Sequence, residues 1–133
     1  MRFSAKEQTG LRAMIELARC HGNGPTALSE VAQAQDLPLP YLEQVAGALR
    51  RAGLLASVRG ARGGYYLARE PGQIRVGDVF RALEGQLVTV DCMGPDGSSC
   101  CEREPTCMAR NVWQSLQDCL TETLDNITLA DVI

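Results

Sequence analysis

The chain has 133 residues, of which 45% are hydrophobic and 22% are charged, and its formal net charge is −3. This length builds one domain with a real core and is too short for two independent domains. The composition excludes wholesale disorder. No apolar run approaches the ~20 residues of a membrane helix, and no signal-peptide pattern opens the chain. We therefore expect a cytoplasmic protein without a membrane partner.

The charges are divided unevenly along the chain. Residues 1–70 contain nine basic and six acidic residues, whereas residues 71–133 contain four basic and ten acidic residues. A basic first half and an acidic second half predict that a surface for a polyanion is confined to the first half.

The first expected helix follows Ser4, which is placed to cap it with Glu7 in capping-box spacing. Its apolar residues follow the spacing of one helical face, and they are Leu11, Met14, Ile15 and Ala18. Glycine and proline at positions 22–25 end this helix.

A second helix is expected at Leu28–Gln35, and a third begins near Leu39 or Pro40 after a tight turn and ends at Gly53. Their inner faces are expected to consist of Leu28, Val31 and Ala32 in the second helix and of Leu42, Val45, Ala46 and Leu49 in the third. Two helices joined by so short a turn form a helix-turn-helix.

A β-hairpin is predicted next. The apolar run 54–58 and residues 65–67 are expected to pair across the glycine-rich turn 59–64. A fourth helix is expected at residues 76–83, closed by Gly85. The predicted fold class is mostly α with a small β-hairpin wing. We expect a winged helix-turn-helix domain at 1–85, a cysteine-rich loop at 86–107, and a dimerisation helix with its tail at 108–133.

The last helix is expected at about residues 108–125. Its apolar residues are spaced by three and four positions, and they are Ala109, Trp113, Leu116, Leu120 and Ile127, flanked by Val112 and Leu124. This seam suits a partner helix, which favours a homodimer over docking on the same domain.

The predicted DNA contacts lie in the third helix and the wing. The amino-terminal end of a recognition helix enters the major groove, where Glu43 can accept from cytosine and Gln44 can pair with adenine. Wing arginines reach phosphates or a narrow minor groove. The candidates are Pro40, Tyr41, Glu43 and Gln44 in the helix, Arg50 and Arg51 at its end, and Arg59 and Arg62 in the wing. A dimer predicts a pseudo-palindromic double-stranded operator with half-sites ~34 Å apart.

The chain contains six cysteines, and Cys92, Cys101 and Cys107 fall within one loop before the last helix. In a reducing compartment, clustered cysteines indicate metal or redox chemistry more often than disulfides. Such a loop suits an iron–sulfur cluster, and zinc is the alternative. Cys20 and Cys119 lie on helical stripes and are expected to be small buried apolar residues.

Several segments together resemble the IscR/NsrR family of bacterial winged-helix regulators. These segments are the wing at 57–65, residues 41–44, the opening at 1–6 and the closing at 125–130. The resemblance spans nearly the whole chain. It implies a homodimeric transcription factor, and several family members hold an iron–sulfur cluster by three cysteines that match Cys92, Cys101 and Cys107.

The fourth cluster ligand stays open. The longer gap after Cys92 makes Cys100 a competitor of Cys101. IscR-like members have a histidine where this chain has Arg110, which offers no lone pair. NsrR-like members use an aspartate of the partner's first helix, where this chain has Gln8 beside Glu7. The only histidine, His21, is expected to be a solvated or capping residue. A 2Fe–2S cluster is favoured over 4Fe–4S.

The sequence therefore predicts a homodimeric DNA-binding regulator that senses iron–sulfur status, redox or nitric oxide stress through a cysteine-ligated cluster. A metal-free thiol-switch regulator and a zinc-stabilised DNA-binding protein are the alternatives. We expect no enzyme, because the chain has no Cys-x-x-Cys pair, no histidine near the thiols and no nucleotide-binding glycine loop.

Overall fold

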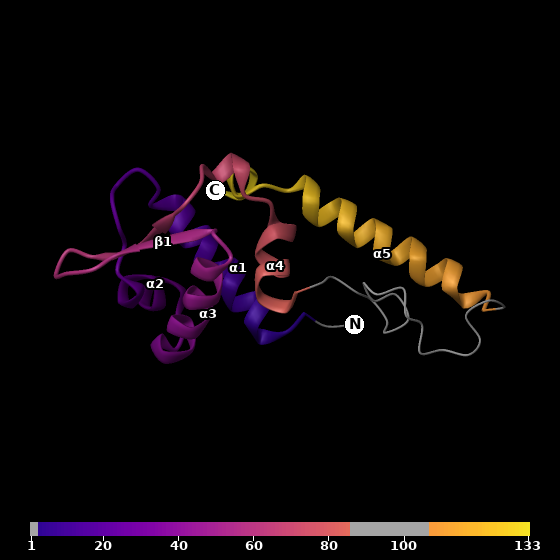
Figure 1. Ribbon diagram of the computed structural model, residues 1–133, viewed down its shortest axis with the longest axis horizontal. Coiled ribbons are helices and arrows are strands. Elements are labelled where there is room, and N and C mark those ends of the chain that lie inside the picture. The colour runs from indigo at the N-terminus through magenta and orange to yellow at the C-terminus, as the bar shows by residue number, and fades with distance from the viewer. Residues whose placement is uncertain (1–2, 86–106) are drawn as a thin grey trace.

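The computed structural model describes residues 3–85 and 107–133. Within these residues the chain is mostly helical with one antiparallel hairpin, which confirms the predicted fold class (Figure 1). The elements are α1 (Ala5–Arg19), α2 (Leu28–Gln35), α3 (Leu39–Arg51), β1 (Leu55–Val58), β2 (Gly64–Leu67), the 3₁₀ turn η1 (Pro71–Gln73), α4 (Val76–Glu84), α5 (Ala109–Asn126) and α6 (Leu129–Val132).

Helix α1 begins after Ser4, as predicted. The hydroxyl of Ser4 accepts a hydrogen bond from the backbone N–H of Glu7 at 3.2 Å, which satisfies one of the free donors of the first turn. Met14 and Ala18 of the predicted apolar stripe are buried, and Leu11 and Ile15 pack against the core from its edge. Helix α1 therefore forms the centre of the amino-terminal unit.

Helices α2 and α3 form the predicted helix-turn-helix. Between them Asp36 adopts a left-handed conformation with φ of 52°, which reverses the chain in a few residues. The four residues expected on the inner face of α3 are all buried, and they are Leu42, Val45, Ala46 and Leu49. Burial of this face leaves the opposite face of α3 open to solvent.

The wing consists of β1 and β2, paired in the register Leu55 with Leu67 and Val58 with Gly64. The backbones of Thr26 and Tyr65 also exchange two hydrogen bonds, of 2.9 and 2.8 Å, which ties the loop before α2 to the hairpin. A Cβ at Gly64 would lie 2.3 Å from the carbonyl oxygen of Thr26, so only glycine permits this approach. The base of the wing is thus held against the helix-turn-helix.

One core joins the helices and the hairpin. Its largest fully buried side chains are Met14, Val31, Leu42, Val45, Leu49, Ile74, Val79 and Leu129. Leu129 comes from the far end of the sequence, and its backbone N–H donates to the carbonyl of Ile74 at 3.0 Å. Residues after α5 therefore return to the amino-terminal unit.

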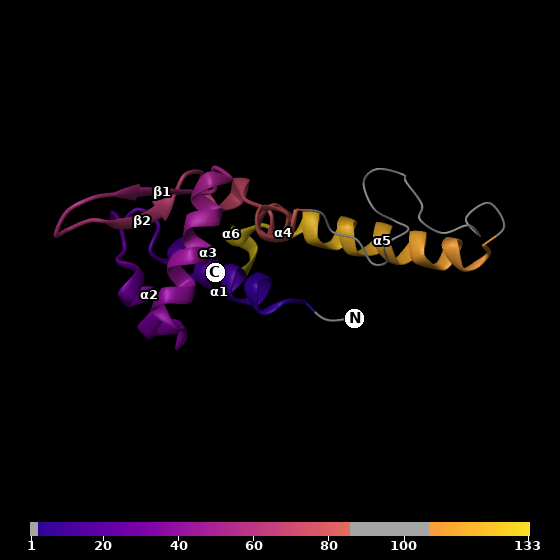
Figure 2. The same ribbon diagram turned by 60° about the horizontal axis from the view of Figure 1, so that its bottom comes forward.

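Helix α5 extends away from α1, α2, α3 and the hairpin in both views (Figures 1 and 2). None of its residues is buried in the single chain. Cys119 is exposed and Cys20 is half-buried, so the expectation of a small buried residue is wrong for Cys119. The physical reason is that only the carboxy-terminal end of α5, near Asp125, packs on α4. The remainder of α5, which includes Cys119, lies outside the core.

None of the helices in the described ranges is both long and apolar enough to cross a membrane.

Candidate nucleic-acid interface and thiol site

The outer face of α3 presents the predicted base contacts. Pro40, Glu43 and Gln44 are exposed and Tyr41 is half-buried, because the neighbouring Leu42 and Val45 turn into the core. Pro38 caps this helix without a side-chain hydrogen bond. The N–H groups of the first turn therefore have no capping side chain, and such groups are suited to a phosphate.

A hollow of about 520 Å³ lies beside this face of α3. It is lined by Lys6, Tyr41, Glu43, Gln44, Val45, Gly47, Ala48 and Arg51. Lys6 comes from the first turn of α1, and its position beside α3 was not predicted from the sequence. No local pattern links position 6 to position 43, because their proximity arises only from the packing of α1 against α3.

The arginines at the end of α3 and in the wing are exposed. Arg50 donates from Nη1 to the hydroxyl oxygen of Ser57 in β1 at 3.3 Å. Arg59 and Arg62 lie in the turn between β1 and β2. Helices α2 and α3 and the wing share one end of the molecule, and α5 extends toward the other (Figure 2). The predicted DNA contacts therefore belong to elements at the same end.

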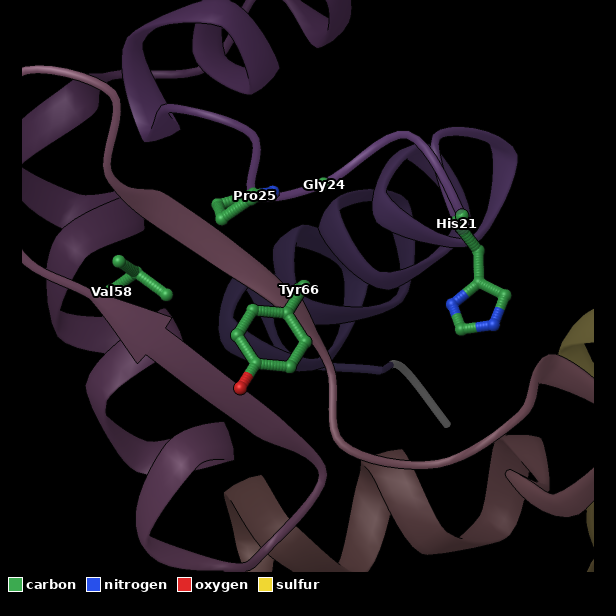
Figure 3. Close-up of a pocket in the computed structure, with 6 residues that line it drawn as sticks. His21, Gly24, Pro25, Val58 and Tyr66 are labelled. Carbon is green, nitrogen blue, oxygen red and sulfur yellow. The ribbon is translucent and has the colours of Figure 1, made fainter.

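A second hollow, of about 370 Å³, lies between the wing and the loop after α1 (Figure 3). Val58 and Tyr66 project into it from one face of the hairpin, and Pro25 and His21 line it from the loop. The Nε2 atom of His21 lies 3.2 Å from a carboxylate oxygen of Glu70, in an exposed pair. This agrees with the expectation of a solvated histidine, and the hollow contains no predicted site residue.

Of the predicted cluster ligands, only Cys107 belongs to the described residues. Cys92 and Cys101, with the competitor Cys100, lie outside them. Cys107 is half-buried, and its carbonyl accepts a hydrogen bond of 3.3 Å from the backbone N–H of Arg110 in the first turn of α5. Cys107 therefore lies next to the positive end of the α5 macrodipole, where negative charge is favoured.

Two carboxylates lie near the point where α4 ends. The hydroxyl of Ser4 donates to Glu84 at 2.6 Å and lies 3.4 Å from a carboxylate oxygen of Glu7. Burial, followed by repulsion from Glu84, raises the pKa of Glu7 above its ordinary value. The other first-helix candidate, Gln8, donates its side-chain N–H to the carbonyl of Phe3 at 2.9 Å. Glu7 therefore offers oxygen ligands, whereas the amide N–H of Gln8 is used locally.

The donor set of the described residues fits part of a cluster site. A free thiol at a helix start suits iron, which thiolates bind in such clusters. No group of three or more His, Cys, Asp or Glu side chains that could hold a metal gathers within residues 3–85 and 107–133. A complete site would therefore need ligands from outside these ranges or from a second copy of the chain.

Comparisons with known proteins agree with the fold and the resemblance. A family model for Rrf2, described as an iron-dependent transcriptional regulator, matches residues 3–133. The HTH-type transcriptional regulator CymR of Bacillus subtilis is 43% identical over 132 residues, which are 99% of this chain and 89% of the relative. IscR of Cronobacter sakazakii is 38% identical over 133 residues, which are 100% of this chain and 80% of the relative.

Solved structures give the same result. The structure of B. subtilis CymR, described as the global cysteine regulator, has a TM-score of 0.82 and 42% identity, with 99% of this chain and 95% of that chain covered. T. potens IscR has a TM-score of 0.81 and 42% identity, with 99% of this chain and 85% of that chain covered. These relatives are named as regulators, which confirms that the chain is not an enzyme. The chain belongs to the Rrf2 family of transcriptional regulators.

Proposed function

We propose that this regulator binds a double-stranded operator as a homodimer, and that a thiol-ligated iron–sulfur cluster adjusts its affinity. The cluster ligands in this proposal are Cys92, Cys101 and Cys107, and 2Fe–2S is preferred to 4Fe–4S. The signal is iron–sulfur status, redox or nitric oxide stress. The division into a winged-helix domain at 1–85, a thiol loop at 86–107 and a dimerisation segment at 108–133 is part of the same proposal.

The DNA contacts are supported by the exposure of the outer face of α3. Glu43 and Gln44 are solvent-exposed polar side chains on a helix that is otherwise anchored by buried residues. In the proposed complex these two side chains contact base edges in the major groove. Lys6 and Arg51, which line the same hollow as Glu43, contribute positive charge toward the phosphates on either side.

The homodimer is supported by the apolar stripe of α5. Met108, Val112 and Leu116 are spaced by four residues, and their exposed fractions are 84%, 56% and 42%. A contiguous exposed apolar stripe of this kind marks an interaction surface. A second copy presents the same stripe, so α5 of each protomer covers the stripe on α5 of its partner in an isologous interface. The occupant proposed for this face is therefore another copy of the chain.

The cluster proposal depends most on one observation, the position of Cys107. Cys107 is separated from α5 by Met108 alone, and the opposite end of α5 is joined to the winged-helix unit by Asp125. A change at the thiol can therefore act on a single rigid helix that connects it to the DNA-binding elements. When bound, an iron–sulfur cluster supplies a centre that changes its charge and its ligands under oxidants or nitric oxide.

The test is anaerobic purification followed by iron and sulfide analysis and an absorption spectrum. The proposal expects iron and sulfide in stoichiometric amounts and visible absorption bands. A colourless protein that carries stoichiometric zinc would exclude the iron–sulfur proposal and would leave the DNA proposal intact.

A metal-free thiol switch is the second candidate. It is favoured by the 43% identity to CymR, whose structure is described as that of a cysteine regulator. In this case Cys100, Cys101 or Cys107 forms a disulfide on oxidation. Mass spectrometry of the oxidised protein, digested without reduction, separates the two candidates. A disulfide-linked peptide in iron-free protein that still responds to oxidant favours the thiol switch.

A further inference from the structure

Helix α5 contacts α4 through an ion pair near its carboxy-terminal end. The Nη2 atom of Arg81 in α4 donates to Oδ2 of Asp125 in α5 at 2.7 Å. The two side chains are 36% and 26% exposed, so the pair is partly shielded from water. Asp78, on the same helix as Arg81, lies farther from the guanidinium, at 3.8 Å. The main partner of Arg81 is therefore on α5.

The other oxygen of Asp125 lies against the first turn of α4. A Cβ at Gly77 would come within 2.1 Å of this Oδ1 atom, so the approach requires glycine. Oδ1 is buried and accepts no hydrogen bond from the residues that the structure describes. A buried acceptor without a partner is costly, and in a native protein it needs an explanation. The carboxylate is compensated by Arg81 and by the positive end of α4.

This contact differs from two links that follow the end of α5. The backbone N–H of Val76 donates to the carbonyl of Ile127 at 2.9 Å, and Leu129 is buried in the core. Both links involve residues after α5, so they fix where the helix ends. Asp125 belongs to α5 itself, as does Leu124, which packs against the core, so contacts at these residues act on the direction of the helix. The contact of Asp125 is the one that is charged and directional.

The length of α5 amplifies any change in that direction. At about 1.5 Å per residue the 18 residues of α5 span about 27 Å, so a tilt of about 10° moves one end relative to the other by about 5 Å. One base-pair step is about 3.4 Å along the DNA. A small tilt that is directed along the DNA therefore changes the separation of two DNA-binding units by more than one base-pair step.

We propose that Asp125, Arg81 and Gly77 form a joint that sets the half-site spacing accepted by the dimer. The joint is a positioning device: none of its residues contacts DNA, and it acts through the direction of α5. This inference rests on the proposed function, because it requires a dimer that is paired through α5 and binds DNA through α3 and the wing.

The test uses the full chain and a pseudo-palindromic duplex selected by the wild-type protein from a random pool. Versions of this duplex have one or two base pairs added or removed at the centre. The variants are Asp125→Asn, which keeps the shape of the side chain, and Arg81→Met, which keeps the apolar stem. Asp118→Asn is the matched control, since Asp118 lies on the same helix and accepts a hydrogen bond of 2.8 Å from Gln114 of that helix, away from α4.

We expect the wild-type protein and Asp118→Asn to lose about tenfold or more in affinity when one base pair is added. Asp125→Asn and Arg81→Met should reduce this loss to about threefold or less while sedimentation shows an intact dimer. Folded, dimeric variants that keep the wild-type spacing preference would overturn the inference. A wild-type protein that selects no duplex, or that is monomeric, would instead refute the proposed function.

A second pair of variants guards against simple loss of folding. Gly77→Ala should lower the melting temperature because its Cβ displaces the carboxylate of Asp125. The same substitution in an Asp125→Ala background should have a much smaller effect, because the obstructing carboxylate is absent. Equal effects in both backgrounds would contradict the contact on which the joint depends.

Discussion

The guanidinium of Arg50 at the end of α3 donates to the hydroxyl of Ser57 in β1 at 3.3 Å. This bond joins the recognition helix to the first strand of the wing. The next residues beyond β1 lead to Arg59 and Arg62 in the hairpin turn. The elements proposed for the major groove and for the neighbouring backbone are thus linked directly, and we expect them to contact DNA as one surface.

Replacing both wing arginines should lower the affinity for DNA and should make that affinity less sensitive to salt. Each phosphate contact contributes about 0.9 to the slope of log K against log salt, so Arg59→Ala with Arg62→Ala should lower the slope by about 1.8. Fluorescence anisotropy at several salt concentrations measures this. Arg19→Ala is the control, because Arg19 is exposed, pairs with Glu16 and lies outside α3 and the wing. An unchanged slope in the double variant would exclude phosphate contacts by the wing.

Gln44 and Lys6 should differ in their effect on sequence specificity. Gln44→Ala should relax discrimination at one base pair by about 1–3 kcal/mol, because a base-edge contact is lost. Lys6→Ala should weaken binding about equally for all sequences and lower the salt slope by about 1, as expected for a phosphate contact. Affinities for a set of single-base-pair operator variants separate the two outcomes. A uniform loss in Gln44→Ala would place it among the phosphate contacts.

The α5 stripe should be required for dimerisation. Leu116→Asp introduces a charge into the apolar stripe of both copies. The loss of about 1.5–3 kcal/mol per buried leucine should weaken the dimer by about 100-fold or more. Sedimentation velocity measures the dissociation constant. As a control, Ser115→Asp adds the same charge at the preceding, exposed position of α5, and it should change the dissociation constant of the dimer little. A dimer that tolerates Leu116→Asp would require a different interface.

The Arg81–Asp125 pair should make the free energy of unfolding fall as the pH is lowered into the acid range. The hydrogen bond from Arg81 lowers the pKa of Asp125 below its ordinary value of 3.8. Because the pKa of Asp125 is lower in the folded state than in the unfolded state, the ion pair stabilises the protein at a pH above the unfolded-state pKa. This contribution is lost as the pH falls through the folded-state pKa. Wild type should exceed Asp125→Asn by about 1 kcal/mol near pH 7, with solvent screening limiting the difference.

Urea unfolding at pH 7 and at a pH below 3.8 checks this prediction. The difference in unfolding free energy between wild type and Asp125→Asn should shrink at the lower pH. The control Asp118→Asn should show a smaller difference at both pH values, because Asp118 accepts its hydrogen bond from the neutral amide of Gln114. A gap between wild type and Asp125→Asn that is independent of pH would contradict the role of the ion pair.

Much of the fold could be predicted because its signals are local. The Ser4 cap, the apolar spacing of α1 and α3, and the glycine-rich turn of the wing each lie within a short stretch of sequence. The bounds of α2 agree with the prediction at both ends. By contrast, η1 and α6 were not expected. Helix α6 has four residues, too few for a periodic pattern, and the burial of its Leu129 depends on a distant contact with Ile74.

The candidate site divides in the same way. The exposure of Glu43 and Gln44 follows from the periodicity of α3, so it could be predicted. The positions of Lys6 beside α3 and of Asp125 beside Gly77 depend on how helices pack, and no local pattern encodes them. The exposure of Cys119 was mispredicted for a related reason. A helical stripe does not say whether the surface that covers it belongs to the same chain.

The central claim is that the thiols control the affinity for DNA. A variant that lacks the three cysteines tests this claim most directly. Wild type and a variant with Cys92, Cys101 and Cys107 all changed to serine are purified anaerobically, and their affinities for the selected duplex are compared at one salt concentration. The account predicts loss of visible absorption in the variant and a change in affinity of about tenfold or more. Identical spectra and identical affinities would contradict it.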